Sequence, residues 1–395
     1  MIYLDNAATS FQKPEQVART MYETMVYYGA NAGRGGHALS VRAGEILYET
    51  RENLCKLFHI RDVERLAFCQ NTTMALNMGM KGVLRPGDHV IIGSMEHNSV
   101  LRPVEALRQN GTISYTIVRG NENGEIALSS VAKAIRPNTR LLVMTHASNV
   151  CGNIFDIEAA ARLAHENQIL FMVDAAQSAG ILEINAENID LLAFPGHKGL
   201  MGPQGTGGLY VRKGIELSTI VEGGTGSLSE SYLQPEEFPD RLESGTQNVP
   251  AIAGLGEGVK FILREGLSAI RKKESELAKL FIDEIENVDA ITIYGTNHLE
   301  NRVGVVGLNV AGMDCVDVSR KLDEEYHIAT RGGLHCAVLA HETLGTKEKG
   351  CVRFSFGYFN TKREVDRAVY ALYKIASGEK GSKYFLYSPI HPHST

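Results

Sequence analysis

The sequence predicts an α/β protein with a mostly parallel, seven-stranded sheet in a large domain, followed by a smaller C-terminal α+β domain. Two observations predict this fold. Short apolar runs alternate with helical stretches between residues 66 and 211, as in a doubly wound sheet. The 395 residues, 44% of them hydrophobic, suffice for two cores. We expect a large domain over 15–255 and a small one over 256–395 together with 1–14.

Composition excludes several classes of protein. The net charge of −6, without a long basic run, argues against nucleic acid as a partner. No apolar run approaches the about 18 residues of a membrane span, and residues 1–5 lack the features of a secretion signal. Six cysteines without a CxxC pair argue against a disulfide scaffold or zinc ribbon, so a cytoplasmic protein is expected. His391 and His393 have no third ligand nearby, so no metal site is expected.

The first sixty residues predict a strand and two helices. A short strand is expected over 2–4, and helical spacing with proline in its first turn covers 14–28. A glycine-rich loop over 31–37 carries Arg34 and His37. Ser40 is then expected to cap a long amphipathic helix that reaches about Phe58.

The sheet is expected from seven apolar runs: 66–69, 90–93, 113–118, 141–145, 169–173, 189–194 and 208–211. Helices are expected between most of them, over 73–83, 100–109, 128–134 and 157–166. The glycine-rich stretch 202–208 resembles a nucleotide loop, but a strand follows it rather than a helix. We therefore interpret it as a turn that passes close to Lys198.

The remaining residues predict the small domain. A polar loop over 222–248 precedes one long helical region that runs from Pro250 to about Glu286. Strands are then expected over 291–294, 304–310 and 351–356, helices over 314–326 and 362–375, and a loop over 330–336.

Lys198 follows the buried run 189–194, among glycines and beside His197. A lysine held away from water becomes a nucleophile toward a carbonyl and can form a Schiff base; the alternative is a solvated lysine in a surface turn. Asp174 ends the run 169–173, which places it at the same edge of the sheet. Pyridoxal 5'-phosphate requires this pair, an anion for its pyridinium nitrogen and a lysine for its aldehyde.

Other residues at this edge suit the same cofactor. Thr72 and Thr73 offer hydroxyls and backbone N–H groups to a phosphate, although they could simply cap the helix that follows. His97 could lie flat on a pyridine ring or be an ordinary loop histidine. Gln177 would contact the ring oxygen, and His197 would assist at the phosphate.

Two further residues suggest chemistry on a thiol and a carboxylate. Cys336 lies in a glycine-rich loop beside His335 and near Arg331, a setting that favours the thiolate; the alternative is a buried apolar cysteine, as expected for Cys351. Arg353 is flanked by apolar residues and needs an anionic partner. That partner is either a substrate carboxylate or a structural acid.

Together these residues resemble the class V aminotransferase family of pyridoxal-phosphate enzymes, which have fold type I. Within it, the chain resembles group II cysteine desulfurases and selenocysteine lyases. The resemblance runs from YLDNAAT at 3–9 to FNT at 359–361, and the loop RGGLHCA at 331–337 is close to that group's Arg-x-Gly-His-His-Cys-Ala. Leu334 departs from the pattern, since it stands in place of the first histidine.

The resemblance implies a role for each residue. Lys198, Cys336 and His97 would be catalytic, and pyridoxal 5'-phosphate would be bound by Thr72, Thr73, His97, Asp174, Gln177, His197, Lys198 and Thr246. Thr246, in segment 243–248, would reach the phosphate of a partner subunit, which implies a homodimer. The amino-acid substrate would be bound by Asn149, Arg353, Arg34 and His37.

The implied reaction is the conversion of L-cysteine to L-alanine, with a persulfide on Cys336 that passes to an acceptor protein. Two alternatives remain at this point: a selenocysteine lyase, which releases selenide from L-selenocysteine, and an aminotransferase on the same scaffold.

Overall fold

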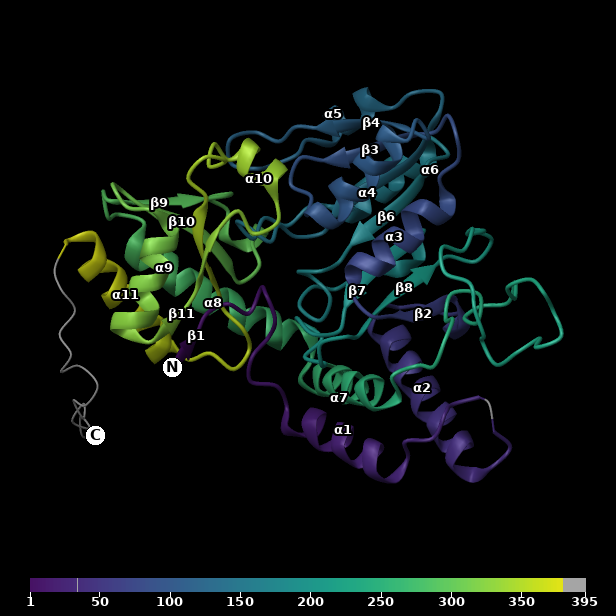
Figure 1. Cartoon of the computed structure of the whole chain (residues 1–395). Helices are drawn as coiled ribbons and strands as arrows, with labels where there is room; N and C mark the ends of the chain where they lie inside the picture. Colours follow the sequence, from purple (N-terminus) through teal and green to yellow (C-terminus); the bar gives the residue numbers. More distant parts are fainter. Residues whose placement is uncertain (34, 379–395) are drawn as a thin grey trace.

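The computed structural model describes residues 1–33 and 35–378, which form two neighbouring lobes, each built around one large sheet, with a third, two-stranded sheet beside them (Figure 1). The larger sheet has seven strands in the order β2-β8-β7-β6-β5-β3-β4. Their bounds are β2 (Leu66–Cys69), β3 (His89–Gly93), β4 (Ser114–Val118), β5 (Thr139–Thr145), β6 (Leu170–Asp174), β7 (Leu191–Pro195) and β8 (Gly207–Val211).

Strand direction in this sheet determines where the chemistry gathers. Strand β8 is antiparallel to both of its neighbours, β2 and β7, whereas every other pair in the sheet is parallel. The expected mostly parallel sheet is thus confirmed. Because the other six strands share one direction, the loops that follow them meet at one edge.

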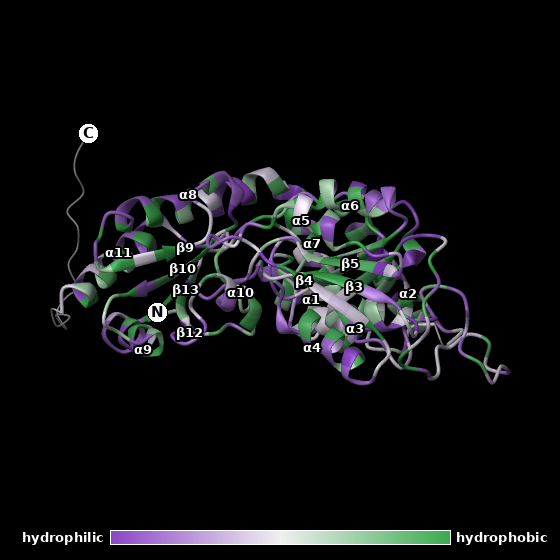
Figure 2. Ribbon diagram, turned by 90° about the horizontal axis from the view of Figure 1, so that it is seen from above, coloured by the Kyte–Doolittle hydropathy of each residue, from purple (hydrophilic) through white to green (hydrophobic). Residues whose placement is uncertain are grey.

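Helices cover both faces of the sheet, which explains why its strands are continuous apolar runs rather than alternating ones. Ile91, Leu142 and Phe171 pack on one face with helices α2, α6 and α7. Their neighbours Val90, Leu141 and Met172 pack on the other face with α3 and α4. Figure 2 shows the hydrophobic strands of this lobe between helices. The helices of this lobe are α1 (Glu15–Tyr27), α2 (Ala38–Leu57), α3 (Thr72–Val83), α4 (Asn98–Gln109), α5 (Leu128–Ala134), α6 (Ile157–Glu166) and α7 (Val249–Glu265).

The smaller lobe holds a four-stranded antiparallel sheet of order β12-β13-β10-β9. A separate two-stranded parallel pair joins β1 (Ile2–Tyr3) to β11 (Ile328–Ala329). The remaining elements are α8 (Leu267–Ile285), β9 (Ile291–Tyr294), β10 (Val305–Val310), α9 (Cys315–Tyr326), β12 (Arg331–Gly333), α10 (Val338–Thr343), β13 (Cys351–Ser355) and α11 (Lys362–Ala376).

Three expectations were wrong in detail. His37, not Ser40, caps α2, since its side chain accepts a hydrogen bond from the Ser40 amide. The long helical region is two helices, because Gly266 adopts φ +84° and ends α7. The expected loop over 330–336 contains strand β12, which pairs with β13.

The division into two domains stays a prediction, and helix α7 crosses the boundary expected between residues 255 and 256. Residues 212–248 form no helix or strand, in line with the expected polar loop. Among the described residues, no helix is both long and apolar enough to cross a membrane.

Candidate active site

The loops at the carboxyl edge of the large sheet line a cavity that is partly open to solvent. Eight of the residues expected to bind the cofactor or substrate line it: Thr72, Thr73, His97, Asn149, Asp174, Gln177, His197 and Lys198. They come from the ends of β2, β3, β5, β6 and β7. Parallel pairing explains how residues 126 positions apart in sequence share one site.

The N-terminus of α3 opens onto this cavity. Asn71 caps the helix, since its side-chain oxygen accepts from the Met74 amide at 2.9 Å. The capping role considered for Thr72 and Thr73 therefore belongs to Asn71. The amides of Thr72 and Thr73 have no acceptor within the helix, so this end can bind an anion.

Ser99 is a lining residue that sequence reasoning missed. Its hydroxyl lies 2.9 Å from His97 Nδ1 and 2.7 Å from Thr73 Oγ1, which links the ends of β2 and β3. The Ser99 amide also donates to His97 Nδ1 at 3.1 Å. These contacts fix the orientation of the His97 ring. Ser99 lies two residues after His97, which the sequence analysis singled out, and this was its only signal.

Burial shifts the pKa values of the ionisable side chains in the cavity. Burial and then the charge of Arg353 lower the pKa of Lys198 to about 8. Burial and then the charge of Lys198 lower the pKa of His97 to about 4, so this imidazole is neutral at pH 7. Burial raises the pKa of Asp174, although the Ala176 amide and Lys198 oppose the effect. A cation placed against Asp174 would stabilise its ionised form.

Two neighbouring side chains differ in their hydrogen bonding. Gln177 Nε2 donates to the carbonyl oxygen of Ala7 at 3.1 Å, which ties the cavity to the turn after β1. His197 Nδ1 is buried without a hydrogen-bond partner among the described residues. Burial, followed by the charge of Lys198, lowers the pKa of His197 to about 4. A buried nitrogen without a partner at the cavity wall suits a polar ligand.

Cys336 belongs to a loop held against this cavity. It is exposed, as the thiolate interpretation requires, whereas Cys351 is fully buried, as expected. The carbonyl oxygen of Cys336 accepts from the Asn98 amide at 2.7 Å, next to His97. The carbonyl of His335 accepts from Asn149 Nδ2 at 2.8 Å. His335 and Cys336 have φ of +51° and +55°, so two consecutive non-glycine residues are held in a costly conformation.

Arg353 is almost fully buried and already has an acidic partner. Its Nη2 lies 2.7 Å from Asp5 Oδ1, and its Nη1 donates to the carbonyl oxygen of Asn149 at 3.0 Å. The structural acid considered for this arginine is therefore Asp5. The Arg353 Nε remains without a hydrogen-bond partner among the described residues.

Four expected site residues that the structure describes do not line this cavity: Cys336, Arg353, Thr246 and His37. Thr246 is exposed and outside its lining, and His37 is an exposed helix cap. Arg34 lies outside the described residues, as do His391 and His393. In the segment 243–248 expected to reach a partner subunit, the Glu243 side chain is only 8% exposed within its own chain and accepts from Arg51 at 2.6 Å.

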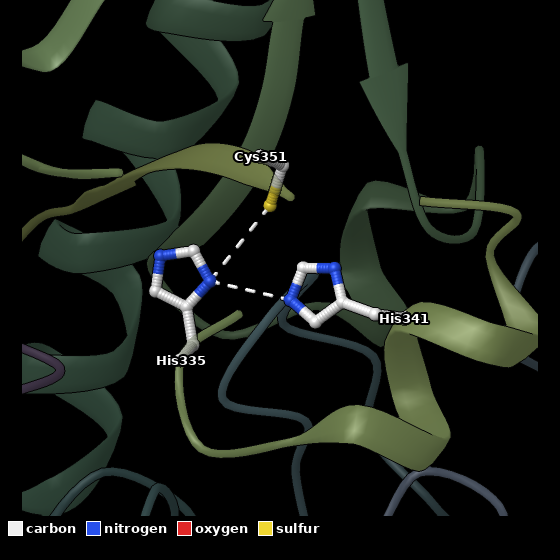
Figure 3. A group of neighbouring side chains, drawn as sticks. All are labelled: His335, His341 and Cys351. Carbon is white, nitrogen blue, oxygen red and sulfur yellow. Dashed lines mark hydrogen bonds between the residues drawn. The ribbon is translucent and has the colours of Figure 1, made fainter. Parts of the chain in front are cut away.

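A second group of polar side chains lies beneath the Cys336 loop. His335, His341 and Cys351 are buried and point toward one another (Figure 3). Sequence reasoning did not group them, because their spacing of six and ten residues matches no common ligand motif.

Comparison with known proteins gives a consistent result. The family model for Aminotransferase class-V matches residues 2–368. A probable cysteine desulfurase of Methanothermobacter thermautotrophicus is 36% identical over 383 residues, which are 95% of this chain and 94% of that protein. The apo structure of the cysteine desulfurase of Thermococcus onnurineus NA1 is 33% identical, with a TM-score of 0.90 over 95% of each chain.

A crystal structure of the Escherichia coli cysteine desulfurase CsdA is 27% identical, with a TM-score of 0.86 over 95% of each chain. The fold and the family expected from the sequence are thereby confirmed. The chain belongs to the class-V aminotransferase family.

Proposed function

We propose that this protein is a pyridoxal-phosphate-dependent cysteine desulfurase, which converts L-cysteine to L-alanine and holds the sulfur as a persulfide on Cys336. The observation that carries the proposal is the backbone hydrogen bond from Asn98 to Cys336, which holds an exposed cysteine beside a cavity lined by Lys198, Asp174 and His97. An aminotransferase would leave this placement of Cys336 unexplained.

The cavity suits pyridoxal phosphate at both ends of that molecule. The N-terminus of α3, with Thr72 and Thr73, offers an anion site for the phosphate, and the unpartnered His197 Nδ1 offers a further polar contact. Asp174 would pair with the pyridinium nitrogen, which removes the cost of ionising a buried carboxyl. When bound, the cofactor supplies an electron sink for the carbanion formed at the substrate Cα.

Lys198 is proposed to move the proton at the substrate Cα. Its lowered pKa of about 8 leaves part of the population neutral at pH 7 to 8, so Nζ can accept a proton near neutral pH. His97 is neutral and is oriented by Ser99, so it can stack on a flat ring without adding charge. The free Nε of Arg353 offers a hydrogen bond to the substrate carboxylate, with Asn149 adjacent.

Cys336 is proposed to take the sulfur. Its thiolate forms an S–S bond with the sulfur of L-cysteine while the Cβ–S bond of the substrate breaks. The electron pair stays on Cβ, which gains a proton to give L-alanine. The enzyme keeps one added sulfur as the persulfide of Cys336, and transfer to an acceptor restores the thiol. The exposure of Cys336, and of Leu334 at 41%, supports delivery to a protein acceptor.

The test is intact-mass analysis of the pyridoxal-phosphate-loaded protein after brief exposure to L-cysteine, with L-alanine measured in parallel. We expect a gain of one sulfur mapped to Cys336, together with L-alanine. Cys336→Ser should keep the cofactor spectrum and lose both products, whereas Cys69→Ser, the matched control, should behave as wild type.

Added sulfur with undiminished L-alanine in Cys336→Ser would exclude the role of Cys336. Absence of both products in a fully loaded wild type would exclude L-cysteine as the substrate. The same assay with L-selenocysteine then tests the lyase alternative, for which full activity of Cys336→Ser is the distinguishing result.

A homodimer with shared sites is part of this proposal. Exposed apolar side chains gather on α1 and α2, namely Tyr22, Met25, Val26, Tyr27, Leu39, Val41 and Tyr48. Such a patch suits a second copy of the chain. Light scattering should give twice the chain mass. If Thr246 serves the partner's site, mixing inactive Lys198→Ala with Thr246→Ala should restore activity, because one site of each heterodimer is then intact.

A reducing location such as the cytoplasm also remains a proposal. All six cysteines, which lie within the described residues, are free thiols, which is what a reducing compartment maintains.

A further inference from the structure

The buried group beneath the Cys336 loop contains two imidazoles and one thiol. His335 comes from the loop after β12, His341 from α10 and Cys351 from the start of β13. Exposure is 3% for His335 and zero for the other two. The proposed desulfurase reaction uses none of the three side chains.

Three potential ligand atoms converge in this group: His335 Nδ1, His341 Nε2 and Cys351 Sγ. They all lie within 4.8 Å of one another. The two nitrogens are 3.4 Å apart, and Sγ is 3.9 Å from His335 Nδ1 (Figure 3). A tetrahedral zinc ion with its usual bond lengths holds two nitrogens about 3.3 Å apart, and a nitrogen and a sulfur about 3.6 Å apart. These two separations are close to those of a zinc site, whereas His341 Nε2 and Cys351 Sγ, which lie within 4.8 Å of each other, would have to approach by up to about 1 Å when zinc binds.

The outward-facing nitrogens of both rings are already engaged. His335 Nε2 lies 3.0 Å from the carbonyl oxygen of Arg331, and His341 Nδ1 lies 2.7 Å from Thr346 Oγ1. A carbonyl accepts only, so His335 carries its proton on Nε2 and presents a lone pair at Nδ1. Contacts of this kind on the distal nitrogen orient histidine ligands in metal sites.

We propose that His335, His341 and Cys351 bind one zinc ion. The donor set of two imidazoles and one thiolate suits this borderline-soft ion. On binding, the Cys351 thiol loses its proton to solvent, while the two neutral imidazoles donate lone pairs. No fourth imidazole, thiol or carboxylate of the described residues joins the group, which leaves one position for a non-protein ligand.

The site has a structural consequence for the reactive loop. His335 immediately precedes Cys336, and both residues hold positive φ. Zinc would connect this strained pair to α10 and β13 and so hold the Cys336 backbone in place. This inference concerns metal binding alone and stands whether or not the proposed function is correct.

The experiment uses the full chain loaded with pyridoxal phosphate, equilibrated with zinc against a weak competing chelator and analysed for metal by mass spectrometry. We expect one zinc per chain in wild type and in Cys336→Ser. Binding should be lost in Cys351→Ser and in His341→Gln. Cys315→Ser is the matched control, since Cys315 is also buried in the small lobe but belongs to no such group, and it should bind as wild type.

X-ray absorption at the zinc edge is measured on the wild-type protein alone, so its result does not depend on whether a variant folds. It should show nitrogen neighbours at about 2.0 Å and one sulfur at about 2.3 Å. Zinc should also raise the unfolding temperature of wild type and leave that of Cys351→Ser unchanged. Wild type without bound zinc, zinc retained in Cys351→Ser, or zinc lost in Cys336→Ser would each overturn the proposal, the last by placing the ion at Cys336.

Discussion

The buried ion pair between Asp5 and Arg353 makes a quantitative prediction. Their side chains are 19% and 2% exposed, and the N–O distance is 2.7 Å. Removing one partner of a buried pair costs about 3–5 kcal/mol, because the other charge stays desolvated. Since Asp5 is partly exposed, water can enter the vacated space. We therefore expect Asp5→Ala to lose about 3 kcal/mol, at the lower end of this range.

For a chain of 395 residues that unfolds as one unit, a loss of about 3 kcal/mol corresponds to a fall in melting temperature of about 4 °C. Asp5→Asn keeps an acceptor for Arg353 and should lose less, about 1–2 kcal/mol. Equilibrium urea unfolding of the cofactor-loaded protein, followed by circular dichroism, measures these differences.

The double variant Asp5→Ala/Arg353→Met tests the cause. It removes the buried guanidinium that Asp5→Ala leaves unpaired, so its free energy of unfolding should be at least about 1 kcal/mol higher than that of Asp5→Ala alone. The reasoning is refuted if Asp5→Ala unfolds within experimental error of wild type, or if the double variant is no more stable than the single one.

Three further predictions concern other parts of the chain. Burial raises the pKa of Glu274 to about 8, so the folded state holds the Glu274 proton more tightly than the unfolded state does. The protonated Glu274 therefore contributes its full stabilisation below pH 4.5, and this contribution is lost as the pH rises to about 8. Glu274→Gln should reduce the fall in unfolding free energy between pH 5 and 8.5, by up to about 4 kcal/mol, and an identical fall would contradict this account. Gly180 has φ +82°, and a Cβ there would clash with the backbone oxygen of Gly199, so Gly180→Ala should cost at least about 2 kcal/mol and lower cofactor loading. Gly205, with φ +78° in open space, is the control, and Gly205→Ala should cost only about 1 kcal/mol by the same urea assay. Ser99→Ala removes the hydroxyl that orients His97 and should weaken cofactor binding about fivefold in equilibrium dialysis; unchanged affinity would show that this hydroxyl is dispensable.

The large sheet could be predicted because most of its strands are buried on both faces and are largely apolar, although the edge strand β4 is only partly buried. Two short elements were missed: β11 has two residues and α10 has six, which is too short for periodicity to show. The break at Gly266 was missed because helical spacing continues on both sides of it. The cap of α2 was missed because histidine is an unusual capping residue.

The lining of the cavity could be predicted because its residues directly follow strands that share one direction. A residue's position just after such a strand therefore places it at the same edge of the sheet as the others. The pairing of Asp5 with Arg353 has no such local signal, since 348 residues separate the partners. The convergence of His335, His341 and Cys351 likewise depends on the antiparallel pairing of β12 with β13. Contacts of this kind follow from tertiary structure alone.

The parallel pairing of β1 with β11 has a consequence for protein synthesis. Ile2 aligns with Ile328, so 326 residues separate the two paired positions in sequence. At about 5–20 residues per second, a ribosome needs roughly 15 seconds to a minute to add that length of chain. Throughout this interval Ile2 and Leu4, which are buried in the finished protein, lack the strand β11 beside which they dock. The segment around Asp5 therefore docks late, and the pocket around Arg353 can be completed only after most of the polypeptide has been made.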